Sequence, residues 1–438
     1  MRAVTILAMK ITKLHLQAFS PTNFLTKLSA HETFPVLMRT GEWTILSWNP
    51  VKRYEWTSAK KAQKDLKKLH AARHVRSAES LPFVGGIIGS VSSDAGYELL
   101  DLKPKAKDRW RLPVVQAGVY EEALLWNGKE IFVIGSKKFA AEVFKIHGRR
   151  VSDKKVPTLK FHSSIPEKKY AADFKKIQRH ILAGDVYQLN LTYTLDASSP
   201  CEDRMLFQKL FQKNLAPCAA YLDAGSHRLL SFSPERFIKI EKGSIETCPI
   251  KGTRPRGIGP RADTRFRQEL LGSAKEQAEL SMITDLLRND IGRIATIGSV
   301  RVAEKRLVKG LVAVWHTSSR IVAELDPRLS PIDALFSMLP AGSVTGCPKR
   351  RAFELIDAIE KVRRGPYTGV LFSLSDHGVL DSSIVIRTLV RKGRTLSLGV
   401  GGGIVADSDV RSEWEETKHK AKPFILAPAA PLRGRGGI

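Results

Sequence analysis

The chain is organised around Ile245-Glu-Thr-Cys-Pro-Ile-Lys-Gly-Thr-Arg-Pro-Arg-Gly257, which places a lysine where a strand should end. The preceding residues 236–241 alternate in polarity and Lys242-Gly243 follows as a turn, which predicts a hairpin. Glycine directly follows Lys251, so backbone can approach a ligand closely there. We expect Lys251 at a strand-to-loop junction, either as an ordinary solvated lysine or as a functional group.

The composition is that of a globular protein. The chain has 438 residues, 43% of them hydrophobic and 26% charged, so it can bury a sizeable core. No apolar run approaches the ~18 residues needed to span a bilayer, and the first ten residues lack a signal-peptide core. Four scattered cysteines show no metal-ligand spacing and are expected to be reduced thiols. We expect a cytoplasmic protein without membrane contact.

The net charge of the chain is unusually high. The formal net charge of +27 raises the alternative of a nucleic-acid-binding protein. The densest basic run extends from Lys60 to Arg76, and its spacing of three and four residues predicts one solvated helix face. No RNA-binding signature with interleaved aromatic residues accompanies it, so no nucleic-acid partner is expected.

The first third of the chain is predicted to be mainly β. Residues 81–91 are glycine-rich and strand-like, but their spacing and the expected absence of a following helix argue against a dinucleotide loop. Residues 149–166 are polar and proline-punctuated, as in a linker. We therefore divide the chain into an amino-terminal subdomain (1–150) and a second subdomain (165–428), intertwined as one unit. The other predicted strands here are 35–38, 43–48, 114–120, 123–126 and 131–134.

The second subdomain begins with a predicted helix and strand. The helix carries an apolar stripe that includes Phe174 and Leu182 and closes at Gly184, and residues 186–195 then form a strand that carries Gln188. A capping box at 273–276 opens a second helix.

Glu279 falls on the apolar stripe of this second helix. A buried carboxylate is costly unless it is paired or bound to metal, so Glu279 either belongs to a site or lies at the edge of the stripe.

Two further stretches carry candidate chemistry. Ala341-Gly-Ser-Val-Thr-Gly-Cys-Pro-Lys349 opens a helix that should end at Gly365-Pro366, and amide groups at its start suit a carboxylate or phosphate. A strand over 383–390 and another over 395–400 should precede a triglycine and a helix from about Asp409. On that helix Glu413, Glu416 and Lys420 share one face, either as Mg²⁺ ligands or as a salt-bridge face.

Six ordered motifs together resemble the chorismate-utilising enzymes. One such motif alone would be weak, but the set extends from about Phe34 to Ala427. The motifs are Ser233-Pro-Glu-Arg-Phe237, Pro249-Ile-Lys-Gly-Thr253, Asp285-Leu-Leu-Arg-Asn-Asp-Ile-Gly292, Gly342-Ser-Val-Thr-Gly346, Asp381 through Ile386-Arg-Thr388, and Gly401-Gly-Gly-Ile-Val-Ala-Asp407.

The resemblance implies an α+β fold with two large facing antiparallel sheets, helices outside and the active site between the sheets. It also implies chorismate as substrate and Mg²⁺ as cofactor. By resemblance the metal ligands are Glu279 and Glu416, with Glu413 beside them. The resemblance also implies that Arg387 and Tyr367 hold the enolpyruvyl carboxylate, and that the ring carboxylate lies near Thr253, Gly402 and Lys420. By the same resemblance Glu235 and His316 are the acid and base.

The branch of the family can be argued chemically. Relatives that use water have a lysine base where this chain has Gln188, which cannot take a proton from water at neutral pH, so ammonia is the expected nucleophile. Lys251 and Thr345 match the branch that forms aminodeoxychorismate for 4-aminobenzoate and folate synthesis, with anthranilate formation as the alternative. By resemblance the amine of Lys251 attacks the ring and expels the hydroxyl. Arg254, Arg256 and Mg²⁺ nearby should favour its uncharged form.

A partner is also expected. No cysteine lies in a Gly-x-Cys-x-Gly nucleophile elbow, so the chain should not release ammonia from glutamine by the usual thiol route. A separate glutamine amidotransferase subunit is therefore expected.

Overall fold

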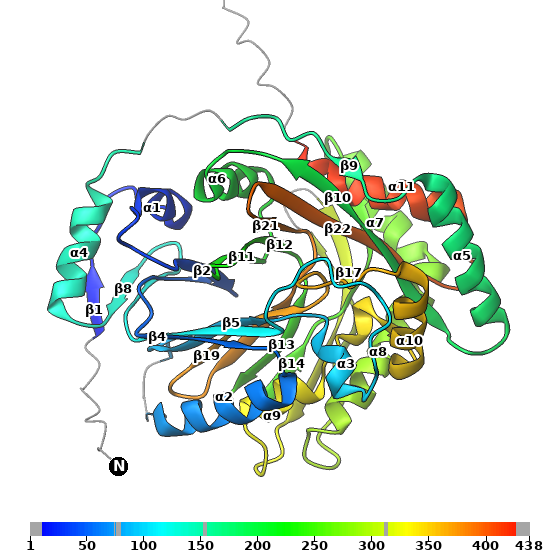
Figure 1. Cartoon of the computed structure of the whole chain (residues 1–438), viewed down its shortest axis with the longest axis horizontal. Helices are drawn as coiled ribbons and strands as arrows, with labels where there is room; N and C mark the ends of the chain where they lie inside the picture. Colours follow the sequence, from blue (N-terminus) through cyan, green and yellow to red (C-terminus); the bar gives the residue numbers. More distant parts are fainter. Residues whose placement is uncertain (1–10, 74, 76–79, 152–155, 311–313, 426–438) are drawn as a thin grey trace, which may run out of the picture.

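The computed structural model describes residues 11–73, 75, 80–151, 156–310 and 314–425. Two large antiparallel sheets face each other, and helices cover their outer faces (Figure 1). The α+β fold is as predicted. None of the helices in the described ranges combines the length and apolar character needed to cross a bilayer. The predictions for the first ten residues, for Arg76 and for residues 426–428 lie outside these ranges.

The first sheet combines strands from both ends of the chain. Strands from before residue 150 and after residue 165 pair directly, because β2 lies beside β11. In spatial order its strands are β1 (Ile11–Leu14), β8 (Ile131–Ile134), β7 (Ala123–Trp126), β3 (Trp43–Ser47), β2 (Val36–Thr40), β11 (Cys218–Asp223), β12 (Arg228–Ser233), β21 (Thr388–Lys392), β22 (Thr395–Ile404), β10 (Gln188–Ser198) and β18 (Gly346–Cys347), with β9 (His162–Ser163) beside β10.

The second sheet is mixed in the same way, because β5 pairs with β19. Residues 1–150 and 165–428 therefore share both sheets. Its strands are, in spatial order, β15 (Ile250–Pro255), β17 (Val314–Glu324), β14 (Ser244–Thr247), β13 (Arg236–Glu241), β20 (Leu380–Ile384), β19 (Val370–Ser375), β5 (Gly86–Val91), β6 (Val115–Tyr120) and β4 (Lys52–Trp56), with β16 (Arg301–Gly310) beside β17.

Three apolar clusters hold the layers together. One packs the first sheet against its outer helices, a second packs the other sheet against α2, α8 and α9, and a third lies between the sheets, where Val36 and Ile45 belong to the same cluster as Ile88 and Leu371. The helices are α1 (Pro21–Lys27), α2 (Ala59–Arg73), α3 (Ala95–Leu99), α4 (Lys137–His147), α5 (Glu167–Leu182), α6 (Asp203–Lys213), α7 (Pro260–Gly272), α8 (Ala274–Gly292), α9 (Pro331–Ser337), α10 (Lys349–Glu360) and α11 (Val410–Ala421).

Several local predictions need correction. The short helix α3 does follow β5, contrary to expectation. Leu182 is 81% exposed rather than part of the buried stripe, because it lies at the last turn of α5. Helix α10 ends at Glu360, before Gly365, because Lys361 takes a left-handed conformation with φ of 60°.

The run 383–390 is two strands rather than one. β20 ends in the second sheet and β21 begins in the first, so the chain changes sheet at residues 385–387. The triglycine 401–403 lies inside β22, paired with β10, rather than after the strand. The hairpin of β13 and β14 around Lys242-Gly243 is confirmed.

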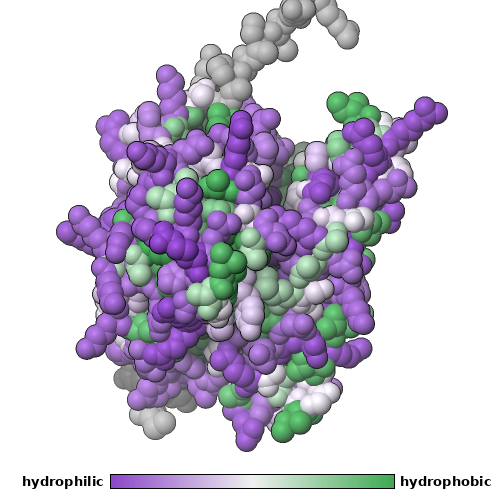
Figure 2. Space-filling view, turned by 90° about the vertical axis from the view of Figure 1, so that its right-hand side faces the viewer, coloured by the Kyte–Doolittle hydropathy of each residue, from purple (hydrophilic) through white to green (hydrophobic). Residues whose placement is uncertain are grey.

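The outer surface agrees with the charged composition. Figure 2 shows the right-hand side of the molecule of Figure 1, where α5 and α10 lie, as mostly hydrophilic with apolar residues in small scattered groups.

Candidate active site

Two strand crossings between the sheets lie side by side and carry Glu235 and Arg387. β12 leads into β13 through Glu235, and β20 leads into β21 through Arg387. The amide of Ile384 donates to the Glu235 carbonyl (3.1 Å), and the amide of Phe232 donates to the Arg387 carbonyl (3.0 Å). These bonds fix both residues where the two sheets meet.

Glu235 is a buried carboxyl. Burial raises its pKa to about 7, although the Ser343 hydroxyl, Lys251 and Arg387 favour the ionised form. Near neutral pH the group can therefore exist with and without its proton, as a general acid requires.

Arg387 places a cation beside Glu235. Within the described residues, its guanidinium makes no hydrogen bond or ion pair. Burial lowers its pKa, while Glu235 and Glu416 act in the opposite direction. A guanidinium without a protein partner is suited to an anionic ligand.

His316 and Thr253 face each other across β17 and β15, with His316 Nδ1 and the Thr253 hydroxyl hydrogen-bonded at 2.8 Å. Burial and Arg387 lower the pKa of His316 to about 4, so the ring is neutral at neutral pH. Its buried Nε2 has no partner among the described residues. An orphaned buried nitrogen at this place is available to a ligand.

Lys251 lies inside β15 rather than at a strand-to-loop junction. The register of β15 against β17 shifts between Lys251 and Thr253, and Gly252 between them has φ of 78°. This bulge re-aims the side chain. Lys251 Nζ lies 3.9 Å from Glu279 Oε2.

The arginines expected to act on Lys251 have other partners. Arg254 pairs with Glu276 (2.6 Å), and Arg256 pairs with Asp263 (2.7 Å). Their positive charges are compensated there, so the expectation that they favour an uncharged Lys251 loses its basis.

Gln188 and Lys251 meet at Gly403. A Cβ at Gly403 would lie 2.9 Å from Gln188 Nε2 and 3.4 Å from Lys251 Nζ. Gln188 is fully buried, and neither polar atom of its amide has a partner among the described residues. The structure therefore places an amine and an unsatisfied amide together.

The adjacent glycine faces α11. A Cβ at Gly402 would lie 2.8 Å from Glu413 Oε2, so only glycine leaves this carboxylate undisturbed. The Ser408 hydroxyl donates to the other oxygen of Glu413 (2.7 Å). Lys420 Nζ donates to the Gly401 carbonyl (2.7 Å) and pairs with Glu416 (2.7 Å). The predicted shared face of this helix is confirmed.

The three candidate metal ligands share a lysine neighbour. Lys275 lies 4.0 Å from Glu279 and also acts on the charges of Glu413 and Glu416. Burial raises the pKa of Glu413. The side chain of Glu416 is 54% exposed, and Lys420 and two other lysines hold its pKa below the usual value. In the described ranges no three acidic, histidine or cysteine side chains already lie at metal-binding spacing. The carboxylate oxygens are the donor type that Mg²⁺ prefers, and lysine ammonium groups pair with Glu279 and Glu416 in this structure.

Thr345 lies in a loop whose backbone bonds β10, and Tyr367 lies beside β22. The Thr345 hydroxyl donates to the Ala341 carbonyl (2.8 Å), so it is already engaged with backbone. The ring of Tyr367 packs on Gly399, where a Cβ would lie 2.3 Å from it. Burial raises the pKa of Tyr367, which keeps the hydroxyl protonated.

Three neighbours were missed by the sequence analysis. Glu276 was expected to complete a capping box, but only the Ser273 half is present, because the side chain of Glu276 pairs with Arg254 instead. The buried Oε2 of Glu276 has no partner among the described residues, and a Cβ at Gly252 would lie 2.5 Å from it. Its position one turn before Glu279 was a usable signal. Ser343 lies in the quoted motif 342–346, but its bond to Glu235 could not be assigned from the sequence, because the two residues are far apart along the chain. Lys275 carried no sequence signal.

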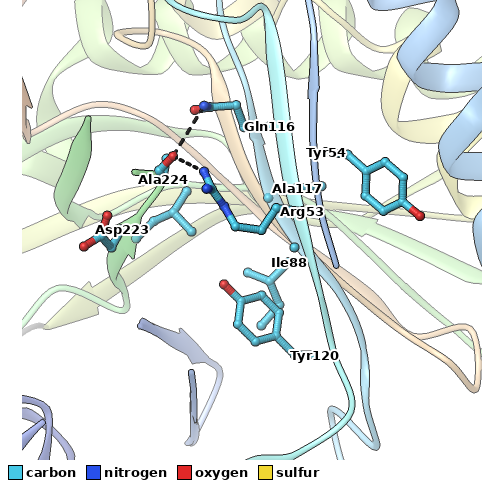
Figure 3. Close-up of a pocket in the computed structure, with 11 residues that line it drawn as sticks. Arg53, Tyr54, Ile88, Gln116, Ala117, Tyr120, Asp223 and Ala224 are labelled. Carbon is cyan, nitrogen blue, oxygen red and sulfur yellow. Dashed lines mark hydrogen bonds between the residues drawn. The ribbon is translucent and has the colours of Figure 1, made fainter. Parts of the chain in front are cut away.

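A small cavity lies elsewhere between the sheets, away from the candidate residues (Figure 3). It is lined by residues of β4, β5, β6 and β11 and encloses about 20 Å³. Arg53 reaches across it to the Ala224 carbonyl (2.5 Å), and the Gln116 amide points to the same carbonyl. This space is too small for a ring with two carboxylates and holds none of the candidate residues.

Comparison with known proteins identifies the family of the chain. Residues 32–426 match the model of the chorismate binding enzyme family. The chain therefore belongs to this family.

Two relatives and one solved structure show which members of the family the chain is similar to. The chain is 38% identical over 356 residues to aminodeoxychorismate synthase component 1 of Salmonella typhimurium, across 80% of this chain and 78% of that protein. It is 39% identical over 269 residues to anthranilate synthase component 1 of Pseudomonas aeruginosa, across 61% of this chain and 55% of that protein. Anthranilate synthase component I from Streptococcus pneumoniae superposes with a TM-score of 0.80 at 28% identity, across 88% and 92% of the two chains. The predicted fold is confirmed.

Proposed function

We propose that this chain aminates chorismate with ammonia, in a Mg²⁺-dependent reaction, to give 4-amino-4-deoxychorismate for 4-aminobenzoate and folate synthesis. The observation that carries the proposal is the meeting of Lys251 and Gln188 at Gly403. Lys251 is the amine available at this place to attack the ring, whereas the neighbouring amide of Gln188 cannot activate water. The names of the aminodeoxychorismate synthase relatives support the same branch.

In the proposed reaction Lys251 Nζ forms a bond to the ring of chorismate, and the ring hydroxyl leaves. The carboxyl of Glu235 is suited to protonate this leaving group, since a pKa of about 7 allows it to lose the proton near neutral pH. Ammonia then forms a bond at the carbon that the hydroxyl left, and the Lys251–ring bond breaks. Arg387 is the cation available to the enolpyruvyl carboxylate, with Tyr367 on a neighbouring segment.

Glu279, Glu413 and Glu416 would hold Mg²⁺. When bound, the ion would supply positive charge to the ring carboxylate of chorismate. Lys420 and the glycine backbone of 401–402 would stand beside the same carboxylate, and Thr253 orients the His316 ring through their hydrogen bond.

Ammonia is proposed to come from a separate glutamine amidotransferase subunit. The relatives named component 1 support a two-subunit enzyme. The pure chain should turn over chorismate with ammonium salts and be inert with glutamine. Glutamine-dependent turnover by the chain alone would remove the need for this partner.

The deciding experiment follows chorismate, Mg²⁺ and ammonium, with the products separated. Lys251→Ala should abolish aminodeoxychorismate formation, whereas Lys239→Ala, a strand lysine paired with Glu241, should retain it. Incubation without ammonium should add the mass of dehydrated chorismate to the wild-type chain and not to Lys251→Ala. Wild-type rates in Lys251→Ala would rule out the lysine as nucleophile.

Anthranilate formation remains the second candidate because of the Pseudomonas aeruginosa relative. Anthranilate as the wild-type product would establish it. The nucleic-acid alternative loses support, because three lysines of α2 pair with carboxylates of the chain, namely Lys60 with Asp101, Lys61 with Asp65 and Lys67 with Asp333.

A further inference from the structure

A buried ion pair lies behind the loop that carries Ser343 and Thr345. Arg364 and Glu360, each with a side chain only 6% exposed, form a bidentate pair with distances of 2.7 and 3.0 Å. The same guanidinium donates to the carbonyls of Val344 (2.8 Å) and Asn190 (2.6 Å). Glu360 accepts from the amide and the hydroxyl of Thr192, both at 2.9 Å.

These bonds connect three segments of the candidate site. Val344 lies between Ser343, which bonds Glu235, and Thr345. Asn190 lies two residues after Gln188 on β10, and Arg364 lies three residues before Tyr367. The pair therefore holds a turn, a strand and the start of the Tyr367 segment in one arrangement.

The pair has no direct access to a ligand. All four guanidinium bonds go to protein oxygens, and neither side chain is among the unsatisfied buried groups of the described residues. A buried pair is weak evidence for stability, because well-packed apolar residues often do as well. The planar guanidinium of Arg364 holds two backbone carbonyls in fixed positions at once, which an apolar side chain cannot do.

We propose that Arg364 and Glu360 are positioning residues for chorismate. Their ion pair locks loop 342–346 against β10 in the arrangement that binds substrate, an inference that rests on the proposed function.

The test compares two buried arginines of similar bonding. Arg364→Lys keeps the charge and loses the fork. The matched control is Arg391→Lys. Arg391 is also a buried arginine: it pairs with Asp203 at 2.7 Å, with side chains 4% and 9% exposed, and it donates to the Cys201 carbonyl (3.1 Å). It links β21 to α6 and lies outside the candidate site. Both variants are measured for melting temperature, kcat, KM for chorismate and amide hydrogen exchange.

Arg364→Lys should raise KM at least about tenfold and speed exchange in residues 342–346, whereas Arg391→Lys should lower the melting temperature and leave KM within about twofold. Equal KM changes in both variants, following the loss of melting temperature, would overturn the positioning role. Unchanged exchange at 342–346 in Arg364→Lys would also overturn it, independently of the reaction. A wild-type chain that neither binds nor converts chorismate would refute the proposed function instead.

If Arg364→Lys does not fold, Thr192→Val supplies the test. It removes one hydrogen bond to Glu360 and leaves the ion pair in place. A KM increase of about threefold or more supports the proposal, and an unchanged KM contradicts it.

Discussion

Replacing Glu235 by glutamine should stabilise the protein at alkaline pH while it abolishes turnover. A carboxyl whose pKa is about 7 in the folded chain, against 4.5 in the unfolded chain, holds its proton more tightly when folded. The free energy of unfolding is then undiminished at low pH, falls as the pH rises from 4.5 through 7, and above pH 7 is lower by about 3 kcal/mol. Glutamine cannot ionise, so it avoids this cost.

The measurement is urea unfolding of both proteins at pH 4.5 and well above pH 7. The stability of Glu235→Gln minus that of the wild type should become more favourable to the variant by about 3 kcal/mol between these conditions. Taking the difference removes the contribution of His316, which has the opposite sign. A difference that does not change with pH would refute the argument that burial controls Glu235.

Three further predictions can be checked directly. The lowered pKa of His316 means that stability is lost as pH falls from 6.5 through 4, and His316→Gln should reduce this loss by about 3 kcal/mol in acid unfolding; an equal loss would contradict it. Glu416→Gln should abolish both activity and any Mg²⁺-induced rise in melting temperature, while the control Glu415→Gln should keep both. If Glu416→Gln keeps its Mg²⁺ dependence, Glu416 is only a member of a surface salt bridge and not a metal ligand. Gly403→Ala should lower kcat at least about tenfold with little change in melting temperature, because its methyl meets Gln188, and normal kcat would exclude this contact from the reaction.

The parts of the site that could be predicted are those set by local periodicity. Glu413, Glu416 and Lys420 share a face because a helix repeats every three to four residues, whatever surrounds it. The helix start at Asp409 was equally readable, since its side chain accepts from the amide of Ser412 (2.9 Å).

The sheet change at Arg387 could not be predicted. Apolar residues continue on both sides of Arg387, because the chain is buried before and after the crossing, so one long strand and two short strands give the same sequence pattern. The positive φ of Arg387 (49°) is imposed by pairing with distant strands, and no glycine or asparagine marks it.

The partners of the charged side chains could not be predicted from the sequence either. Arg254 was expected to act on Lys251, which is three residues away, but its partner is Glu276 on the next helix. Lys251 instead faces Glu279. Such pairings depend on how β15 and α8 pack, and this packing is set by residues throughout the second sheet.

The mixed origin of the two sheets has a consequence for how the protein is made. Met38 pairs with Ala220 and Ser90 pairs with Leu371, so β2 and β5 find one of their two partner strands only late in synthesis. Such a high contact order slows folding, and an emerging chain exposes unpaired strand edges until β19 and β22 leave the ribosome. Neither half is therefore expected to fold alone, and nascent chains should depend on chaperones until almost the whole sequence has been translated.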